Sequence, residues 1–598
     1  MPRPNPLISD RHVSFLLYEV LDAEGLLSFP YFSDHSRETF DAYLGVCRRL
    51  AREVLFPAYK TVDEEPPRLE GGRVFVHPKM HEIWPKLVEL GVIAASRPHG
   101  VGGQQIPLTV STAAHLYIMA GITSAYSYTG LTTGAAHLVE AFGSEALKTE
   151  YLPALNEGRW SGTMALTEPQ AGSSLADVAT KATPDGDHFL LSGAKTFISA
   201  GDHDLTENIV HMVLARIEGA PAGIKGVSLF LVPKLRPGKD GLVPNDVRST
   251  GLIHKIGWRA LPSVVLSFGE AGDCRGWLVG EPNQGISYMF QMMNEARISV
   301  GADAVATASV AYHESVAYAK ERLQGRPVTS KDPRQPPVPI MEHADVRRML
   351  LRQKAIVEGG IGLILFVAKL SDAAEHASSA DERDRARLLL DLLTPVAKSF
   401  PAEKGFESNA LAIQVHGGYG YSTEYLPEAW LRDQKLNSIH EGTTGIQALD
   451  LLGRKVPARG GAALAVLMED VSATCLRAGK VGVPEAWSHA VREAAKTIGA
   501  LSSDLARRGA SGDVEGMLGH SADYLDLFST FVVSWLWLLQ AAVAREALAD
   551  GRGPSAFYEG LLAAARYWIR TELPKIDALV TLCRENEASY VEMRPDWF

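Results

Sequence analysis

The chain has 598 residues, and at about 150 residues per domain this length predicts roughly four structural units. Hydrophobic residues make up 46% of the chain and charged residues 22%, which excludes an intrinsically disordered or collagen-like protein. Lys and Arg number 59 against 70 Asp and Glu, and the resulting net charge of -11 argues against a nucleic-acid partner.

The first predicted unit is helical and covers residues 1–160. Apolar residues recur there at helical spacing, as at Phe40, Tyr43, Leu44 and Cys47. The first residues lack the apolar core of a secretory signal peptide, so the cytoplasm is the expected location.

The second predicted unit, residues 161–282, is a small β domain. Short β-branched or alternating runs are separated there by clusters of Gly, Pro and Asp, which is typical of strands joined by turns. The runs are 188–192, 209–214, 227–232 and 263–268.

Helical patterns return in a third unit, residues 283–456, and a fourth, residues 461–598. Five prolines between residues 325 and 339 make a helix or a central strand improbable there, so we expect an excursion between two long helices. Residues 457–461 contain Pro and Gly and predict a hinge before the fourth unit.

Residues 531–539 form the most apolar run in the chain. Asp526 and Gln540 bracket this run, which is far shorter than the roughly 20 apolar residues of a membrane span. We therefore expect a helix buried on most sides; the alternative is a surface that docks on a partner or on lipid.

The cysteines and the common motifs exclude several classes of site. Cys47, Cys274, Cys475 and Cys583 lack paired spacing, which argues against disulfides and cysteine-ligated zinc, so we expect a reducing compartment and no metal. The sequence has no G-x-G-x-x-G, G-x-x-x-x-G-K-[ST], H-E-x-x-H or G-x-S-x-G. The dinucleotide, P-loop, zincin and serine-hydrolase classes therefore lose their usual support.

Three clusters rich in Gly and Thr remain as candidate sites: residues 164–174, residues 193–201, and a third that runs from 414–420 to 439–447. Taken one at a time, each has an ordinary structural explanation. Thr167-Glu-Pro169 is typical of a turn, and the glycines at 417–420 are typical of the end of a helix.

Glu441 is the best single candidate for a catalytic base. The structural alternative is that Glu441 merely precedes a helix that begins near Thr443, where the helix dipole favours negative charge. However, no other charged side chain lies between Lys435 and Asp450 in the sequence. Uncharged neighbours let a carboxylate lose water and gain basicity, so the sequence favours Glu441 as a base.

The three clusters, in this order, resemble the acyl-CoA dehydrogenase family over about residues 37–456. The first two are similar to the flavin-side segments of that family, the third to its Q-V-x-G-G-x-G, R-D and E-G-T motifs. The matching residues are Thr167-Glu-Pro-Gln-Ala-Gly-Ser173, Lys195-Thr-Phe-Ile-Ser199, Gln414-Val-His-Gly-Gly-Tyr-Gly420, Arg432-Asp433 and Glu441-Gly-Thr443. The part beyond residue 461 is similar to the C-terminal helical extension of larger members.

The resemblance implies an α+β multidomain fold: an N-terminal helical domain, a middle β-barrel-like domain, a C-terminal four-helix bundle and an extra C-terminal helical domain. It implies an FAD-dependent enzyme that converts an acyl-CoA to trans-2-enoyl-CoA, with the α-proton passing to Glu441 and the β-hydride to N5 of FAD. The expected partners are acyl-CoA, an electron-transfer flavoprotein and a second copy of the chain, with peripheral membrane contact through the extension.

The resemblance also implies individual ligand contacts. The isoalloxazine ring would lie against Leu166, Thr167, Phe197 and Ser199, with Phe197 over one face. Arg322 corresponds to an arginine that reaches FAD phosphate across a subunit interface. The other implied cofactor contacts are Gln414, Gly417, Gly418 and Thr443, and the implied substrate contacts are Ser173, Arg297 and Gly442.

Three positions depart from the family pattern: Ser174 replaces Asp, His440 stands where Tyr is frequent, and Gly445 replaces Gln. Some members carry their base just before the position of Arg297, but this chain has Ala296 there, so Glu441 keeps the role.

Two other functions fit the same resemblance. An acyl-CoA oxidase shares the fold and the base but passes electrons to dioxygen. A non-catalytic assembly protein would keep the flavin fold and dock through its apolar C-terminal helix, although the presence of Glu441 argues against it. The acyl chain length stays open, because one methylene is worth only about 1–3 kcal/mol of discrimination.

Overall fold

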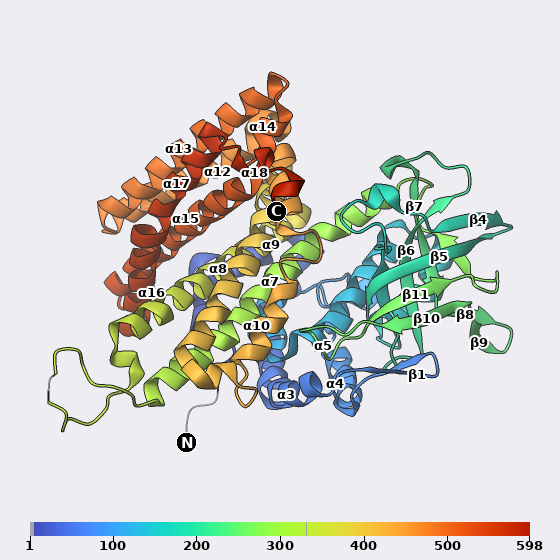
Figure 1. The fold of residues 1–598 in the computed structure, drawn as a ribbon, viewed down its shortest axis with the longest axis horizontal. Coiled ribbons are helices and arrows are strands. Elements are labelled where there is room, and N and C mark those ends of the chain that lie inside the picture. Colours follow the sequence, from blue (N-terminus) through green and yellow to red (C-terminus); the bar gives the residue numbers. More distant parts are fainter. Residues whose placement is uncertain (1–4, 331) are drawn as a thin grey trace. The chain divides into compact units, whose positions relative to one another are not determined.

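The computed structural model describes residues 5–330 and 332–598, without the side chains of 290–294. The chain forms two compact units (Figure 1). The middle unit is Asp34–Ser299, and the helical unit combines Met1–Ser33 with Val300–Phe598. Helix α7, Gly285–Glu321, runs from the middle unit into the helical unit.

The middle unit begins with the helices that the apolar periodicity predicts. Phe40, Tyr43 and Cys47 of α2 are all buried. The helix starts with a capping box, in which Ser36 N–H donates to Thr39 Oγ1 at 2.9 Å and Thr39 N–H donates to Ser36 Oγ at 3.4 Å. The helices are α2 (Arg37–Leu50), α3 (Phe56–Glu64), α4 (Pro78–Glu89), α5 (Leu108–Phe142) and α6 (Glu145–Asn156).

The same unit contains an eight-stranded sheet in the order β10-β11-β5-β12-β7-β6-β3. All four strands predicted from the sequence are present, as β5, β6, β7 and β11. Strand β4 pairs with both β5 and β6 and so closes the ring β4-β5-β12-β7-β6, which confirms the barrel-like form. The strands are β3 (Trp160–Ala165), β4 (Lys181–Asp185), β5 (His188–Ser199), β6 (Asn208–Ile217), β7 (Val227–Pro233), β10 (Val247–Leu252), β11 (Ser263–Phe268) and β12 (Arg275–Leu278), with small hairpins β1–β2 (Arg68–Glu70, Arg73–Phe75) and β8–β9 (Leu235–Gly238, Gly241–Pro244).

Strand β6 is buried on both faces. Successive side chains of a strand point to opposite sides, and here each side packs in a different apolar core. Met212 and Leu214 belong to the apolar core that includes Leu138 of α5. Val213 and Ala215 belong to a second core inside the curled sheet. The strand is therefore apolar on both faces rather than alternating, and only the buried His211 interrupts its apolar run at 209–214.

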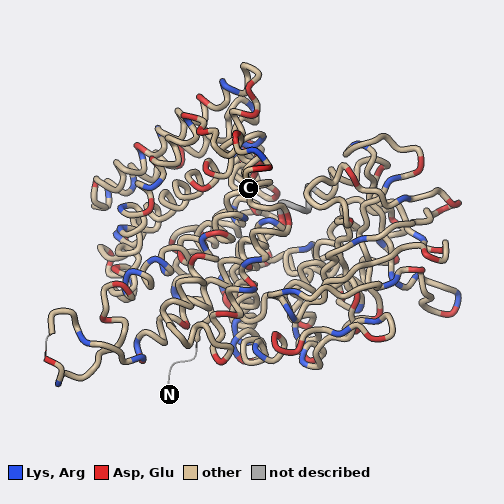
Figure 2. The backbone as a smooth tube through the Cα atoms, in the orientation of Figure 1, with Lys and Arg blue, Asp and Glu red and all other residues tan. Residues whose placement is uncertain are grey.

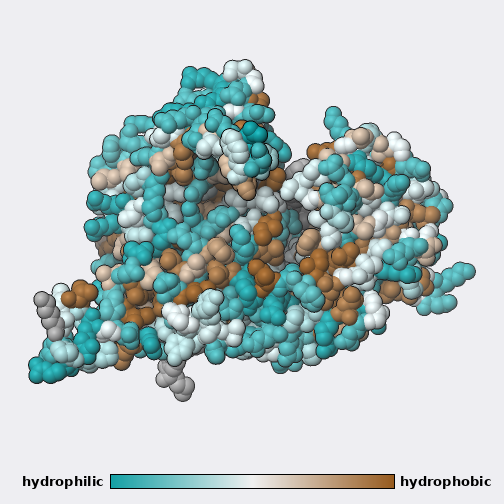
Figure 3. Space-filling model, in the orientation of Figure 1, coloured by the Kyte–Doolittle hydropathy of each residue, from teal (hydrophilic) through white to brown (hydrophobic). Residues whose placement is uncertain are grey.

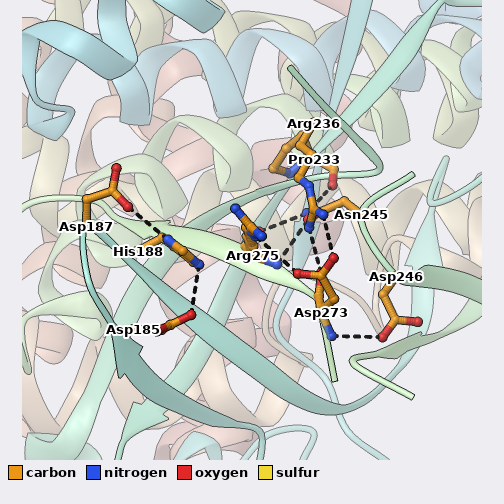
Figure 4. Close-up of polar contacts among 9 residues, drawn as sticks. All are labelled: Asp185, Asp187, His188, Pro233, Arg236, Asn245, Asp246, Asp273 and Arg275. Atoms are coloured by element: carbon orange, nitrogen blue, oxygen red, sulfur yellow. Dashed lines mark hydrogen bonds and ion pairs between the residues drawn. The ribbon is translucent and has the colours of Figure 1, made fainter. Parts of the chain in front are cut away.

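The loops at one end of the sheet are fastened by Asn245, which is fully buried (Figure 4). Its Nδ2 donates to the carbonyl oxygens of Pro233 and Arg275, both at 2.8 Å. Its Oδ1 accepts from Arg275 N at 3.0 Å and from the Arg236 guanidinium at 3.2 Å. One amide in the segment before β10 thus connects the end of β7 with the start of β12.

The helical unit contains the predicted four-helix bundle, which is built from α7, α8, α9 and α10. A Cβ at Gly301 of α7 would lie 2.0 Å from the Ala397 carbonyl oxygen of α9, so glycine lets these helices approach closely. The predicted proline-rich excursion connects α7 to α8, and it carries a bridge between Leu323 and Pro339. The helices are α8 (Ala344–His376), α9 (Ala380–His416), α10 (Pro427–Leu436) and α11 (Thr444–Asp450).

A second group of helices follows the predicted hinge. Arg459, Gly460 and Gly461 all have positive φ and so break the helical path before α12. Hydrophilic residues cover most of the visible face of this group (Figure 3). The helices are α12 (Ala462–Lys480), α13 (Glu485–Ala510), α14 (Val514–Leu518), α15 (Ser521–Ala549), α16 (Ser555–Tyr567), α17 (Ile576–Glu585) and α18 (Ser589–Glu592).

Helix α15 is the centre of this group and carries the apolar run 531–539. Its most apolar 18-residue window has a mean hydropathy of 1.7, so the helix is long and apolar enough to cross a membrane, but 94% of that window is buried inside the protein. Its Trp535 Nε1 donates to Thr474 Oγ1 of α12 at 2.8 Å, and its Trp537 Nε1 donates to Ala355 O of α8 at 3.1 Å. The interpretation as a helix buried on most sides is confirmed.

Residues 5–33 pack in the helical unit, a grouping that no pattern in the sequence predicts. Arg11 donates to Tyr558 Oη at 2.6 Å, and the fully buried His12 ring lies 3.3 Å from Glu358 O. Helical periodicity shows which side of a short helix is apolar but not which distant helix covers it.

Substitution of Gly359 by Ala is expected to loosen the contact between α8 and α15. A Cβ there would lie 2.6 Å from Trp537 Nε1 and 2.9 Å from Val533 Cγ1. Overpacking of this kind costs about 1–3 kcal/mol, so the melting temperature should fall by about 1–4 °C. Gly499→Ala on α13, where a Cβ meets nothing within 4 Å, is the control and should be neutral or stabilising. An unchanged melting temperature for Gly359→Ala would contradict the close packing.

Candidate active site

The segment after β3 is fastened to β5 by a buried ion pair. Lys195 Nζ donates to Glu168 Oε1 at 2.7 Å, and both side chains are almost completely buried. The same ammonium donates to Leu166 O at 3.0 Å and to Leu214 O at 2.7 Å. The Thr196 N–H donates to Thr167 O at 2.9 Å. These bonds hold the first two Gly- and Thr-rich clusters side by side.

The surroundings of this pair keep it charged at neutral pH. Burial alone would raise the pKa of Glu168, but the Lys195 charge and hydrogen bonds from Lys195, Thr180 and Ala179 lower the pKa to about 2. Burial lowers the pKa of Lys195 to about 8 despite the adjacent carboxylate. At pH 7 the Glu168 carboxyl is therefore ionised and the Lys195 amine is protonated.

The side chains expected to contact the flavin ring lie next to this pair. Phe197 has a φ of 59°, which is rare for a residue with a side chain. The residue is exposed, with 62% of its surface accessible to solvent. The half-buried Thr167 and Ser199 offer hydroxyl groups that bond no other group within the part of the chain that the structure describes. An exposed aromatic ring with two available hydroxyls fits the apolar face and polar edge of an isoalloxazine.

The helical unit holds four of the residues expected to contact the cofactor, of which Arg322 is the one expected to reach its phosphate. Arg322 follows the last turn of α7, and its guanidinium lies 5.7 Å from the centre of the Tyr419 ring. Gly417 and Gly418 precede Tyr419 and are exposed, and a Cβ at either would meet nothing within 4 Å. Gln414 is exposed in the last turn of α9. An exposed arginine beside bare backbone fits a phosphate ligand.

Glu441 lies in the loop between α10 and α11 and is half-buried. Its φ is 52°, and the following Gly442 has a φ of 86°. Gln447 Nε2 from α11 fixes this turn by donating to Glu441 O at 3.1 Å and to Gly442 O at 3.3 Å. Thr443 caps α11, and its Oγ1 accepts from Ile446 N at 3.3 Å. A left-handed acidic residue held by the next helix is typical of a functional position.

His440 immediately precedes this residue and is half-buried. Burial, and secondarily the charge of Lys398, lower the pKa of His440 to about 3. The imidazole is therefore neutral at pH 7 and adds no positive charge beside Glu441.

The residues expected to contact CoA differ in their exposure. Ser173 is exposed in the loop after β3. Gly442 is half-buried, and a Cβ there would lie 2.6 Å from Gln447 Nε2. Arg297 of α7 is buried, with 3% of its surface exposed. The substrate roles of all three stay predictions.

Two positioning residues were not singled out by sequence reasoning, namely Glu168 and Lys195. The sequence nevertheless contains a pattern that points to them: Glu168 is the only charged residue in 164–174, and Lys195 is the only one in 193–201. Two opposite charges, each isolated in an uncharged cluster, indicate a buried pair.

The structure shows the environment of two further positions that depart from the family pattern, Ser174 and Gly445. Ser174 Oγ donates to Asp177 Oδ2 at 2.8 Å, and Gly445 is exposed.

Within residues 5–330 and 332–598, no group of three or more His, Cys, Asp or Glu side chains is arranged to hold a metal ion.

Four family descriptions match consecutive parts of the chain. Residues 38–159, 163–269 and 283–456 match the acyl-CoA dehydrogenase N-terminal, middle and C-terminal domains. Residues 467–594 match a domain described as acetyl-CoA dehydrogenase C-terminal like.

Whole-chain comparisons give the same family. The 3-methylmercaptopropionyl-CoA dehydrogenase of Ruegeria pomeroyi is 38% identical over 533 residues, 89% of this chain and 90% of that protein. The broad-specificity linear acyl-CoA dehydrogenase FadE5 of Mycobacterium tuberculosis is 34% identical over 604 residues, 96% of this chain and 95% of that protein. The structure of an acyl-CoA dehydrogenase complexed with FAD from Bacillus anthracis shares the fold, with a TM-score of 0.74, 21% identity, and coverage of 95% of this chain and 91% of that one. The chain therefore belongs to the acyl-CoA dehydrogenase family.

Proposed function

We propose that this FAD-dependent oxidoreductase desaturates an acyl-CoA thioester between Cα and Cβ to give trans-2-enoyl-CoA. The observation that carries the proposal is the placement of Glu441. Its carboxylate stands in a left-handed turn, and no other charged residue occurs between Lys435 and Asp450. The left-handed conformation is unfavourable for an L-residue, and such residues are concentrated at sites where function requires the side chain to point in one direction.

The chain's own groups supply the proton chemistry. The Glu441 carboxylate removes the weakly acidic α-proton, and the Glu441 N–H donates to the thioester oxygen, where enolate charge develops. FAD, when bound, supplies the acceptor for the β-hydrogen and its two electrons. Phe197, Thr167 and Ser199 orient the flavin ring through stacking and hydrogen bonds.

The test is an anaerobic titration of the purified holoenzyme with saturated acyl-CoAs of increasing chain length. We expect the flavin absorbance to bleach, fastest for one range of chain lengths. Absence of bleaching with every chain length would reject the proposed reaction.

We propose an electron-transfer flavoprotein as the acceptor of the flavin electrons. The reduced enzyme should reoxidise faster with that protein than with air-saturated buffer. Stoichiometric hydrogen peroxide and no acceleration by the flavoprotein would instead identify an acyl-CoA oxidase.

A homodimer is part of the proposal, with Arg322 and Gly417–Gly418 of each copy contacting the cofactor of its partner. Their exposure supports this, because these groups remain available to a second molecule. Sedimentation of the holoenzyme should give twice the mass of 64.7 kDa. A monomer that keeps its FAD would contradict it.

We also propose a cytoplasmic enzyme with peripheral membrane contact. The four cysteines are free and buried, which supports a reducing compartment. Val591, Trp597 and Phe598 are exposed apolar residues of the extension and support contact with lipid. Fractionation of cells should place most of the protein in the cytoplasm and a minor, salt-resistant fraction on membranes. Recovery from the periplasm alone would reject this location.

A further inference from the structure

A pocket of about 470 Å³ opens among the C-terminal helices and is separate from the residues discussed so far. It is lined by residues from the start of α13, the last turns of α15, α16 and the short helical segment Trp568–Glu572 that follows. Its volume is in the range of small-molecule sites in proteins. The lining residues that matter here are Trp487, Arg545, Leu562, Arg566 and Arg570.

Three arginines face this one pocket without an acidic partner. Across the described ranges of the chain, Arg545, Arg566 and Arg570 make neither an ion pair nor a side-chain hydrogen bond. The Nε of Arg545 is buried and lacks a hydrogen-bond acceptor. A buried donor that bonds nothing in the protein is a group that a ligand can satisfy.

Two neighbouring acids, Glu485 and Glu546, are already engaged by other basic residues. Glu485 accepts from Arg492, and Glu546 accepts from Arg477 through both oxygens, at 2.9 and 2.6 Å. Basic and acidic residues are interspersed along these helices (Figure 2). The unpaired arginines are therefore not the result of a shortage of acids on the extension.

The arrangement concentrates positive charge in a protein whose net charge is -11. Arg566 and Arg570 are four residues apart, so they lie on neighbouring helical turns, where like charges repel. An anion between them would relieve this repulsion. A guanidinium group offers paired donors that match the oxygens of phosphate.

We infer that this pocket binds the phosphate group of an organic phosphate. The three guanidinium groups contact the phosphate oxygens. The apolar wall formed by Leu562 and the mostly buried Trp487 (6% exposed) contacts the rest of the ligand. The site does not depend on the desaturation reaction, since its residues belong to the extension alone.

The test is calorimetric titration of the FAD-loaded protein with inorganic pyrophosphate, alongside flotation with vesicles. We expect binding by the wild type and at least a tenfold weaker affinity for Arg566→Gln/Arg570→Gln and for Arg545→Gln. The control is Arg507→Gln on α13, whose side chain is exposed and pairs with Asp504 outside the pocket. It should bind pyrophosphate like the wild type. Far-UV circular dichroism and FAD content verify that each variant is folded.

The vesicle arm identifies the source of the phosphate. Vesicles of phosphatidylcholine with phosphatidylglycerol are compared with vesicles of phosphatidylcholine alone. Arginine-dependent flotation with phosphatidylglycerol and no pyrophosphate binding would support a lipid headgroup. Arginine-dependent pyrophosphate binding without flotation would support a soluble phosphate.

Two results would overturn the inference. One is that neither pyrophosphate nor phosphatidylglycerol binding depends on Arg545, Arg566 or Arg570. The other is that the double variant raises the KM for acyl-CoA as much as it weakens pyrophosphate binding, because the pocket would then belong to the substrate site.

Discussion

Glu441→Gln protein is expected to bind FAD normally and to reduce it about 10²–10⁴-fold more slowly than the wild type when acyl-CoA is added. The amide keeps the size of the carboxylate and its backbone turn, which Gln447 fixes through the carbonyl oxygens of Glu441 and Gly442. It cannot accept the α-proton. Stopped-flow absorbance at the flavin band, under anaerobic conditions, measures the rate directly.

Glu441→Asp is the matched control for this substitution. It keeps the carboxylate but withdraws it by one methylene, so we expect flavin reduction between the wild-type and Gln rates. Rapid flavin reduction by the Gln variant would show that another group removes the proton. Loss of FAD from the Gln variant would assign residue 441 to cofactor binding instead.

Lys195→Met is expected to cause the largest loss of stability among substitutions near the flavin segments. It leaves the buried Glu168 carboxylate without its cation, which typically costs about 3–5 kcal/mol. Because the ion pair holds Leu166 and Thr167 beside β5, FAD content should fall as well. Thermal unfolding and the ratio of flavin to protein absorbance measure the two effects.

A double-mutant cycle separates pairing from simple disruption. Glu168→Gln alone should also destabilise, while Lys195→Met/Glu168→Gln should lose less than the sum of the two single variants. Lys79→Met, which removes the exposed partner of Glu82 in the same unit, is the control and should cost at most about 1 kcal/mol. Additive losses would contradict a coupled pair.

The ion pair also predicts a difference in acid stability. The pKa of Glu168 is lowered from 4.5 to about 2 in the folded protein. Its contribution, on the order of 3 kcal/mol, is therefore complete above pH 4.5 and is lost as the pH falls from 4.5 toward 2. The stability gap between wild type and Glu168→Gln should narrow over this window and stay constant from pH 5 to 7.

Much of the fold follows from local patterns in the sequence. The strands at 209–214 and 227–232 are apolar except for the buried His211 and Ser228, because both faces of β6 and β7 are buried. The proline content of 325–339 excludes regular structure there. By contrast, the pairing of Arg11 with Tyr558 joins positions 547 residues apart, and no local pattern specifies such a partner.

Some features of the candidate site could likewise be predicted from the sequence, and others could not. Glu441 could be selected from sequence because its neighbours are uncharged, but its left-handed conformation appears only in the structure. The burial of Arg297 was equally invisible, since an arginine in a helix is usually exposed. The arginines at 545, 566 and 570 come from separate helical segments, so their common pocket depends on helix packing.

The central claim is tested most directly by the mass of the product formed from an acyl-CoA deuterated at both Cα and Cβ. The holoenzyme, given an electron acceptor, should release an enoyl-CoA that has lost one deuterium from each carbon. Recovery of the intact deuterated acyl-CoA, with the flavin still oxidised, would contradict the assignment of this chain as a desaturating enzyme.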